Sequence, residues 1–143
     1  MSARWLVKTE PAQYSYADLA REGHVTWDGV SNALALLHLR AMAPGDLVLV
    51  YHTGKEKSVV GLARVTKGPS SGPAKPATAR AARSVVVDFE PVAAAKKPVT
   101  LAWMRVEPRC KDLPLLRMSR LSVMPVDVSS WECLLHAAGL ATA

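Results

Sequence analysis

Two aromatic residues, Trp27 and Tyr51, stand where the sequence could build a site for a planar ring. Trp27 precedes a turn at Asp28-Gly29, and Tyr51 ends a predicted strand. Aromatic side chains at such edges stack on nucleic-acid bases, with roughly 1–3 kcal/mol per base. The amide of Asn32 can pair with a base edge. These residues favour a pocket for one flipped-out base. The alternative is that the aromatic residues belong to the core, which we favour for Trp5.

A second polar group near the C-terminus suits contacts with phosphates or base edges. Arg117 and Arg120 stand three residues apart, beside Ser119 and Ser122. Guanidinium groups bind phosphate oxygens and base-edge acceptors through paired hydrogen bonds. The alternative for Arg120 is a structural role, in which its guanidinium holds a loop by bonding backbone carbonyls. The sequence favours neither role over the other.

Catalytic and cofactor motifs are missing from the sequence. It has no Gly-x-Ser-x-Gly, no His-Glu-x-x-His, no phosphate-binding glycine loop and no dinucleotide fingerprint. The cysteines are not at Cys-x-x-Cys spacing and the four histidines are scattered, so we expect no metal site. A weak-acid hydrolase would need Glu10 and Asp28 in one cleft with perturbed titration. We therefore predict a non-enzymatic protein without a cofactor.

Charge is unevenly distributed along the chain. The net charge is +6, and residues 55–120 alone carry +9, while residues 1–54 carry −1 and residues 121–143 carry −2. A clustered basic excess attracts polyanions through steering and counterion release. The alternative is a solvated surface that is merely basic, and charge alone does not decide between the two.

Short strands and helices of one domain, residues 1–143, must position these side chains. Strands are predicted at residues 5–7, 47–52, 59–66, 85–92 and 122–126, with a strand or strand-to-helix junction at 99–103. Helices are predicted from Ser15 to Gly23, from Asn32 to Met42 and from Ser129 to Ala138. Residues 68–83, rich in Pro, Gly, Ser and basic residues, predict a mobile loop. This order is typical of an α+β fold around a curved or closed sheet.

The compartment follows from the apolar runs and the cysteines. No apolar run approaches the roughly 18–20 residues of a membrane helix, and no apolar stretch after Arg4 makes a signal peptide. Cys110 and Cys133 are interpreted as reduced thiols. We expect a cytoplasmic protein that does not bind membranes and is a monomer or a weak dimer.

Six phrases, in order from residue 5 to residue 125, resemble the EVE domain family. They are Trp5-Leu6-Val7-Lys8-Thr9-Glu10-Pro11, Trp27-Asp28-Gly29-Val30-x-Asn32, Pro44-Gly45-Asp46-Leu47-Val48, Tyr51-His52, Val60-Gly61-Leu62-Ala63 and Ser119-Arg120-Leu121-Ser122-Val123-Met124-Pro125. The resemblance implies a PUA-like mixed β pseudo-barrel with short helices packed around it, similar in fold to the YTH domain. It also implies a non-catalytic module that recognises a modified base, such as methylated cytosine or adenine, in DNA or RNA.

The resemblance further implies a set of ligand-binding residues. Trp27 would be a wall of the base pocket, and Lys8 and Thr9 would lie at the end of the first strand. The residues that would bind the base or close its pocket are Lys8, Thr9, Trp27, Asn32, Tyr51, His52, Arg120 and Ser122. The residues that would contact phosphates are Lys75, Arg80, Arg83 and Arg117.

One segment departs from the family's pattern. After Trp27-Asp28-Gly29-Val30 the family continues with Arg, Asn, Tyr, Gln, Ala, Arg, Asn, where this chain has Ser31-Asn32-Ala33-Leu34-Ala35-Leu36-Leu37. The pocket would lose polar partners, which would change or weaken base binding. Two other functions therefore stay open. One is a pocket for a small anionic or aromatic ligand without nucleic acid, and the other is a scaffold that docks through the Leu-rich helix at 33–39.

Overall fold

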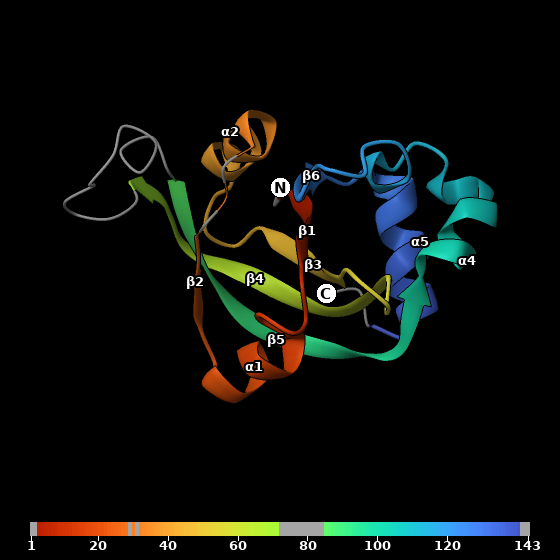
Figure 1. Cartoon of the computed structure of the whole chain (residues 1–143), viewed down its shortest axis with the longest axis horizontal. Coiled ribbons are helices and arrows are strands. Elements are labelled where there is room, and N and C mark those ends of the chain that lie inside the picture. The colour runs from red at the N-terminus through yellow and green to blue at the C-terminus, as the bar shows by residue number, and fades with distance from the viewer. Residues whose placement is uncertain (1–2, 29, 31, 72–84, 141–143) are drawn as a thin grey trace.

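The structure is a computed structural model, and it describes residues 3–28, 30, 32–71 and 85–140 (Figure 1). One mixed sheet of six strands has the order β2-β5-β4-β3-β1-β6. The strands are β1 (Arg4–Thr9), β2 (Val25–Trp27), β3 (Leu47–His52), β4 (Ser58–Ser71), β5 (Val85–Thr100) and β6 (Val123–Pro125). The helices are α1 (Tyr16–Glu22), α2 (Ala33–Ala41), α4 (Leu101–Val106) and α5 (Val128–Ala138), with short 3-10 turns η1 (Pro108–Cys110) and η2 (Pro114–Leu116).

The sheet curls into a half-barrel whose two ends face each other across an opening. β1 pairs with β3 in parallel, and the other neighbours pair in antiparallel fashion. In Figure 1, β2 lies on one side of the opening and β1 with β6 on the other, while α1 and α2 flank it. The predicted α+β fold, a mixed pseudo-barrel with short helices packed around it, is confirmed.

Local signals in the sequence account for the helix ends. The Ser15 hydroxyl accepts from the backbone N–H of Asp18, whose carboxylate accepts from that of Ser15, and this capping box starts α1. The Asn32 side-chain oxygen accepts from the Ala35 N–H at 3.0 Å and starts α2. Gly139, at φ 70°, ends α5 in the left-handed conformation. These three predicted boundaries are confirmed.

A buried carboxylate explains the Pro44-Gly45-Asp46 turn before β3. Asp46 is 5% exposed and accepts hydrogen bonds from the backbone N–H groups of Ala3 and Ala43 and from the Trp5 indole N–H, all at 2.9–3.0 Å. A buried charge is tolerated when donors surround it in this way. The turn thereby ties the start of β1 to the start of β3, and Trp5 is a core residue, as predicted.

A glycine in β4 lets α1 approach the sheet closely. A Cβ atom on Gly61 would lie 2.4 Å from a ring carbon of Tyr16, so no larger residue fits there without movement. The Tyr16 hydroxyl donates to the Leu62 carbonyl at 2.7 Å. This contact fixes α1, and with it the segment between β1 and α1, against the central strands.

Three strand predictions need correction. The short strand β2 was not predicted, and Gly29 of the predicted turn lies outside the described residues. β4 continues to Ser71, so residues 68–71 are strand rather than loop, and residues 72–83 lie outside the described part. Register shifts between Val65 and Ser70 place Pro69 at an irregularity, where a missing N–H is tolerated. The predicted strand 85–92 continues as β5 to Thr100. The predicted strand-to-helix junction at 99–103 is confirmed, because β5 leads directly into α4.

The thiols, the helix lengths and the distribution of metal-binding side chains bear on three further predictions. Cys110 and Cys133 are buried free thiols whose sulfur atoms lie 4.0 Å apart. Among the described residues, no helix has the length and apolar character needed to cross a membrane. Within the same ranges, no three His, Cys, Asp or Glu side chains gather as metal ligands would.

Candidate nucleic-acid interface between the sheet edges

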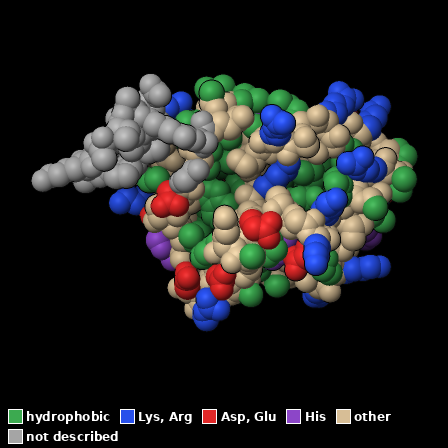
Figure 2. Space-filling model, viewed as in Figure 1, with side chains coloured by type: hydrophobic (Ala, Val, Ile, Leu, Met, Phe, Trp, Pro, Cys, Tyr) green, Lys and Arg blue, Asp and Glu red, His purple; other side chains and the backbone are tan. Residues whose placement is uncertain are grey.

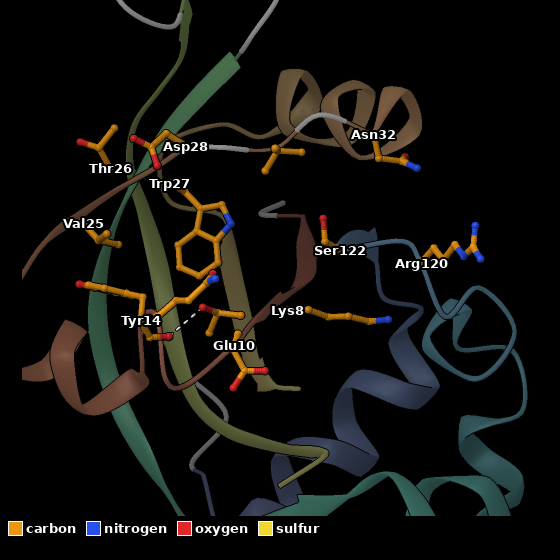
Figure 3. A pocket seen from close by; sticks show the side chains of 13 residues that line it. Lys8, Glu10, Tyr14, Val25, Thr26, Trp27, Asp28, Asn32, Arg120 and Ser122 are labelled. Atoms are coloured by element: carbon orange, nitrogen blue, oxygen red, sulfur yellow. Dashed lines mark hydrogen bonds between the residues drawn. The ribbon is translucent and has the colours of Figure 1, made fainter. Parts of the chain in front are cut away.

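A cavity of about 560 Å³ fills the opening of the half-barrel, between β2 and the end of β1 (Figure 3). Residues from both ends of the sheet line it, because the curl brings these ends together. The lining residues are Lys8, Thr9, Glu10, Gln13, Tyr14, Val25, Thr26, Trp27, Asp28, Val30, Asn32, Arg120 and Ser122. The cavity is within the size range of pockets for small ligands, about 300–1,000 Å³.

Trp27 forms an aromatic wall of this cavity. Its ring stands edge-on to Tyr14, with centroids 6.4 Å apart and an interplanar angle of 84°, and lies tilted against Phe89 at 5.3 Å. Trp27 is only 9% exposed and also belongs to the hydrophobic core. Trp27 therefore both lines the cavity and packs in the core, and its role as a wall for a bound base stays a prediction. An indole held by its neighbours loses little freedom when a ring stacks on it.

The segment between β1 and α1 carries the second aromatic side chain of the pocket, Tyr14. The Thr9 hydroxyl donates to the Tyr14 carbonyl at 2.7 Å and holds this segment in place. The Tyr14 hydroxyl donates to the Glu22 carboxylate at 3.3 Å. Burial raises the pKa of Tyr14 to about 12, and the charge of Glu22 adds to the shift. The phenol therefore stays protonated and hydrogen-bonds to Glu22 of α1, while its ring packs against Trp27.

The cationic side of the pocket comes from Lys8 and from the segment that leads into β6. The Lys8 ammonium donates to the Ser119 carbonyl at 2.9 Å, and burial lowers its pKa. The Lys8 backbone N–H donates to the Ser122 carbonyl at 2.9 Å. These two bonds hold Arg120 and half-buried Ser122 at the pocket. No hydrogen bond or ion pair joins the exposed Arg120 side chain to another described residue, which favours a ligand role over a structural one.

Two carboxylates also line the pocket. The Glu10 carboxylate accepts from the Thr53 hydroxyl at 3.2 Å and from the Ala12 N–H at 3.4 Å, so it braces the segment after β1. Asp28 is exposed at the end of β2. Figure 3 shows them on opposite sides of the Trp27 ring. The two groups thus share a cavity, as a weak-acid hydrolase would need, but the indole separates them.

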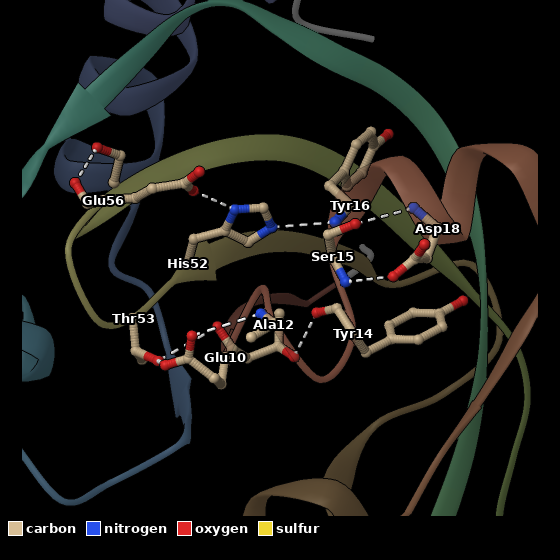
Figure 4. A network of polar contacts seen from close by, with 11 residues as sticks. Glu10, Ala12, Tyr14, Ser15, Tyr16, Asp18, His52, Thr53 and Glu56 are labelled. Atoms are coloured by element: carbon tan, nitrogen blue, oxygen red, sulfur yellow. Dashed lines mark hydrogen bonds and ion pairs between the residues drawn. The ribbon is translucent and has the colours of Figure 1, made fainter.

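Two of the predicted pocket residues, Tyr51 and His52, are absent from its lining. Both are buried, with 3% and 6% exposure. The Nε2 atom of His52 accepts from the Tyr16 N–H at 3.0 Å, and its Nδ1 atom pairs with Glu56, so the ring fastens α1 to β3 (Figure 4). The physical reason for His52 is a tertiary contact, because the start of α1 covers its ring at the end of β3.

None of the predicted phosphate-contacting residues is among the described residues that line the pocket. Arg117 lines a neighbouring groove rather than the pocket itself. Lys75, Arg80 and Arg83 lie outside the described residues. Figure 2 shows Lys and Arg side chains gathered over the half of this face that holds α4, α5 and the segment leading to β6, and Asp and Glu over α1 and across the middle of the face.

Sequence reasoning did not assign several lining residues to the pocket. Gln13 and Tyr14 come from a segment whose return to the pocket depends on the Thr9 hydrogen bond. Val25 and Thr26 belong to β2, which is too short to leave a periodic pattern. Six of the eight predicted ligand-binding residues do meet here, namely Lys8, Thr9, Trp27, Asn32, Arg120 and Ser122.

Comparisons with known proteins identify the family. The curated relative thymocyte nuclear protein 1 from human is 35% identical over 79 residues, which cover 47% of this chain and 35% of that protein. The chain thus spans about a third of the length of this relative. The solved structure of Rpa0253 from Rhodopseudomonas palustris is 36% identical, with a TM-score of 0.87 over 99% of this chain and 96% of that one.

A third similar structure is that of human THYN1 in complex with DNA that contains 5-methylcytosine. It has a TM-score of 0.85 and covers 99% of this chain and 100% of that one, at 24% sequence identity, so it supports the fold. The family model of the EVE domain matches residues 3–137, nearly the whole chain. The chain therefore belongs to the EVE domain family.

Proposed function

We propose that the chain is a non-catalytic nucleic-acid-binding module that takes one modified base into the cavity between β2 and β1. The observation that carries this proposal is the cavity itself. It has a fixed aromatic wall on one side and cationic side chains on the other, and it opens on a face rich in Lys and Arg (Figure 2). A base that leaves its stack needs such a ring to stack on and polar groups at its edge.

The lining offers a partner for each part of a methylated base. Trp27 provides the stacking surface, and Val25 and Val30 provide apolar contacts for a methyl group. The carboxylate of Asp28 can accept from an exocyclic amino group, as acidic side chains do with cytosine. The Asn32 oxygen is committed to the α2 cap, so its amide nitrogen is the part left to donate to the base.

Methylated cytosine is the first base to test. Human THYN1, similar in fold, has been solved with DNA that contains 5-methylcytosine. An enzymatic role is less well supported, because Glu10 is engaged with Thr53 and the Trp27 ring separates it from Asp28. We also propose a cytoplasmic location, since free buried thiols are typical of reducing compartments.

A pocket for a small anionic or aromatic ligand is the second candidate. Lys8 and Arg120, across the cavity from Trp27, would suit such a molecule. The neighbouring groove that contains Arg117 extends the cationic surface beyond the volume of one small ligand, which favours a strand. The two functions differ in how affinity depends on the length of the nucleic acid.

Fluorescence anisotropy at one stated salt concentration tests the proposal, because affinities for nucleic acid depend on salt. The probes are matched DNA and RNA oligonucleotides, single- and double-stranded, with cytosine or 5-methylcytosine at one central position. We expect a preference of about tenfold or more for the methylated base in at least one series, equivalent to about 1.4 kcal/mol. Equal binding of both members in every series would contradict it, and oligonucleotides with N6-methyladenine extend the comparison.

A further inference from the structure

A second groove adjoins the base pocket and shares two residues with it. The groove measures about 380 Å³, and Asn32 and Arg120 line both spaces. Its other lining residues are Leu34, Arg117, Met118, Ser119 and Leu121. The groove thus lies between the start of α2 and the turn that precedes β6, directly beside the proposed base site.

The lining of this groove combines exposed apolar side chains with cations. Leu34 is 36% exposed and Met118 is 43% exposed, so both side chains are accessible to a ligand in the groove. The charged side chains of the lining are Arg117 and Arg120, and no carboxylate is among them. Apolar contact for a ring or sugar, with guanidinium groups for a phosphate, matches one nucleotide of a strand.

The turn that carries Arg117 and Met118 is held in place before any ligand arrives. The Met118 N–H donates to the Pro114 carbonyl at 2.8 Å, and the Leu121 N–H donates to the Met118 carbonyl at 3.0 Å. The Lys8 ammonium donates to the Ser119 carbonyl at 2.9 Å. Leu121 is 3% exposed and anchors the turn to the core. Lys8 lines the base pocket, so one side chain sets the position of the groove relative to that pocket.

We propose that this groove binds the nucleotide next to the modified base. Leu34 and Met118 contact its ring or sugar, and Arg117 and Arg120 bind its phosphate. Apolar side chains beside a flipped base commonly occupy or support the disturbed step of the stack. This inference rests on the proposed function, because it places the neighbour of a base that already occupies the first pocket. It predicts that affinity grows when the nucleotides that flank the modified base are added.

The test compares a methylated mononucleotide with a trinucleotide that has 5-methylcytosine at its centre. Binding is measured by calorimetry for the wild-type chain, for the double variant Leu34→Ser/Met118→Ser and for Arg117→Gln. Leu37→Ser is the matched control, because Leu37 lies on the same helix, is 57% exposed and is absent from both linings. All substituted side chains are exposed, and equal thermal unfolding temperatures establish that the variants are folded.

We expect the wild-type chain and Leu37→Ser to bind the trinucleotide more tightly than the mononucleotide. The double variant should lose roughly fivefold or more of that gain, the lower end of one base contact. Arg117→Gln should reduce the dependence on salt by about one phosphate contact. The inference would be overturned if the double variant still bound the trinucleotide as much more tightly than the mononucleotide as the wild-type chain does. It would also be overturned if Leu37→Ser lost as much of this difference as the double variant.

The two proposals fail in different ways. The base-reader proposal fails if the wild-type chain binds trinucleotides with cytosine and 5-methylcytosine equally well. The groove is supported if the double variant then still loses the gain from the flanking nucleotide, and it is overturned if the gain is retained. Absence of binding to every probe would overturn both.

Discussion

Trp27 serves both the core and the pocket, and its position explains why. It ends β2, the strand at one edge of the sheet, so one part of its ring packs on Phe89 and Tyr14 while another part borders the cavity. The indole is therefore fixed by the same contacts that stabilise the fold. A truncation to alanine would remove the pocket wall and leave a cavity in the core at once, and truncations of this kind cost about 3–5 kcal/mol.

A pair of milder substitutions separates the two roles of Trp27. Trp27→Leu keeps an apolar side chain and removes the stacking surface, so we expect base affinity to fall by about 1–3 kcal/mol. Phe89→Leu disturbs the same packing from the far side of the indole, and we expect it to lower the free energy of unfolding by about 1–3 kcal/mol with little effect on affinity. Urea unfolding and anisotropy measure both quantities. An affinity loss that simply follows the stability loss in both variants would mean that Trp27 acts only as a core residue.

The pocket depends on one contact between elements, the close approach of α1 to β4. Tyr16 packs on Gly61 and donates to Leu62, and the His52 ring bonds to the Tyr16 N–H. The segment from Glu10 to Tyr14, which lines the pocket, lies between β1 and this anchored helix. The pocket therefore needs α1 to be seated correctly against the sheet.

Gly61→Ala tests this contact directly. The added Cβ would lie 2.4 Å from the Tyr16 ring, so the ring or the strand must move. We expect a loss of about 1–3 kcal/mol in the free energy of unfolding, the usual cost of overpacking. In a Tyr16→Ala background the same change should cost much less, because the ring is gone. Equal costs in both backgrounds, measured by urea unfolding, would contradict the close contact.

Elements whose signals are local could be predicted, and those set by tertiary pairing could not. The cap at Ser15 and the start of a helix at Asn32 depend on neighbouring residues, and both were predicted correctly. β2 has three residues and exists because Trp27 and Val25 pair with β5, far away in the sequence. Tyr51 and His52 lie outside the pocket lining for a related reason. Both are buried, and the burial of His52 depends on its contact with the distant Tyr16 N–H, which the sequence does not reveal.

The whole molecule positions its site by leaving the barrel open. Trp27 belongs to β2, at one edge of the sheet, and Lys8 belongs to β1, next to the opposite edge strand β6. The curl brings the two residues to one cavity. Tyr51 and His52, at the end of β3, are buried in the same fold and do not reach the cavity. The excess positive charge of residues 55–120 supplies part of the basic half of the face in Figure 2.

The buried thiols report on the integrity of the whole fold. Burial, with the neighbouring Cys133, raises the pKa of Cys110 to about 12. Alkylation needs the thiolate, so the native protein should react slowly with iodoacetamide at about pH 8, and the unfolded protein should react quickly. Intact-mass spectrometry over time, with and without urea, follows both. Rapid alkylation of Cys110 in the native protein would contradict the buried, protonated thiol.

The most direct test of base binding between β2 and β1 is an NMR titration of the tryptophan indole N–H groups. The chain has four tryptophans, and Trp27→Phe assigns the resonance of Trp27. Trp5, whose indole bonds to Asp46, is an internal control, and Trp103 is 37% exposed beside a different groove. We predict that an oligonucleotide with one 5-methylcytosine shifts the Trp27 resonance, leaves that of Trp5 unchanged, and does so more strongly than its unmethylated match. A shift of Trp103 with no change at Trp27 would contradict the site.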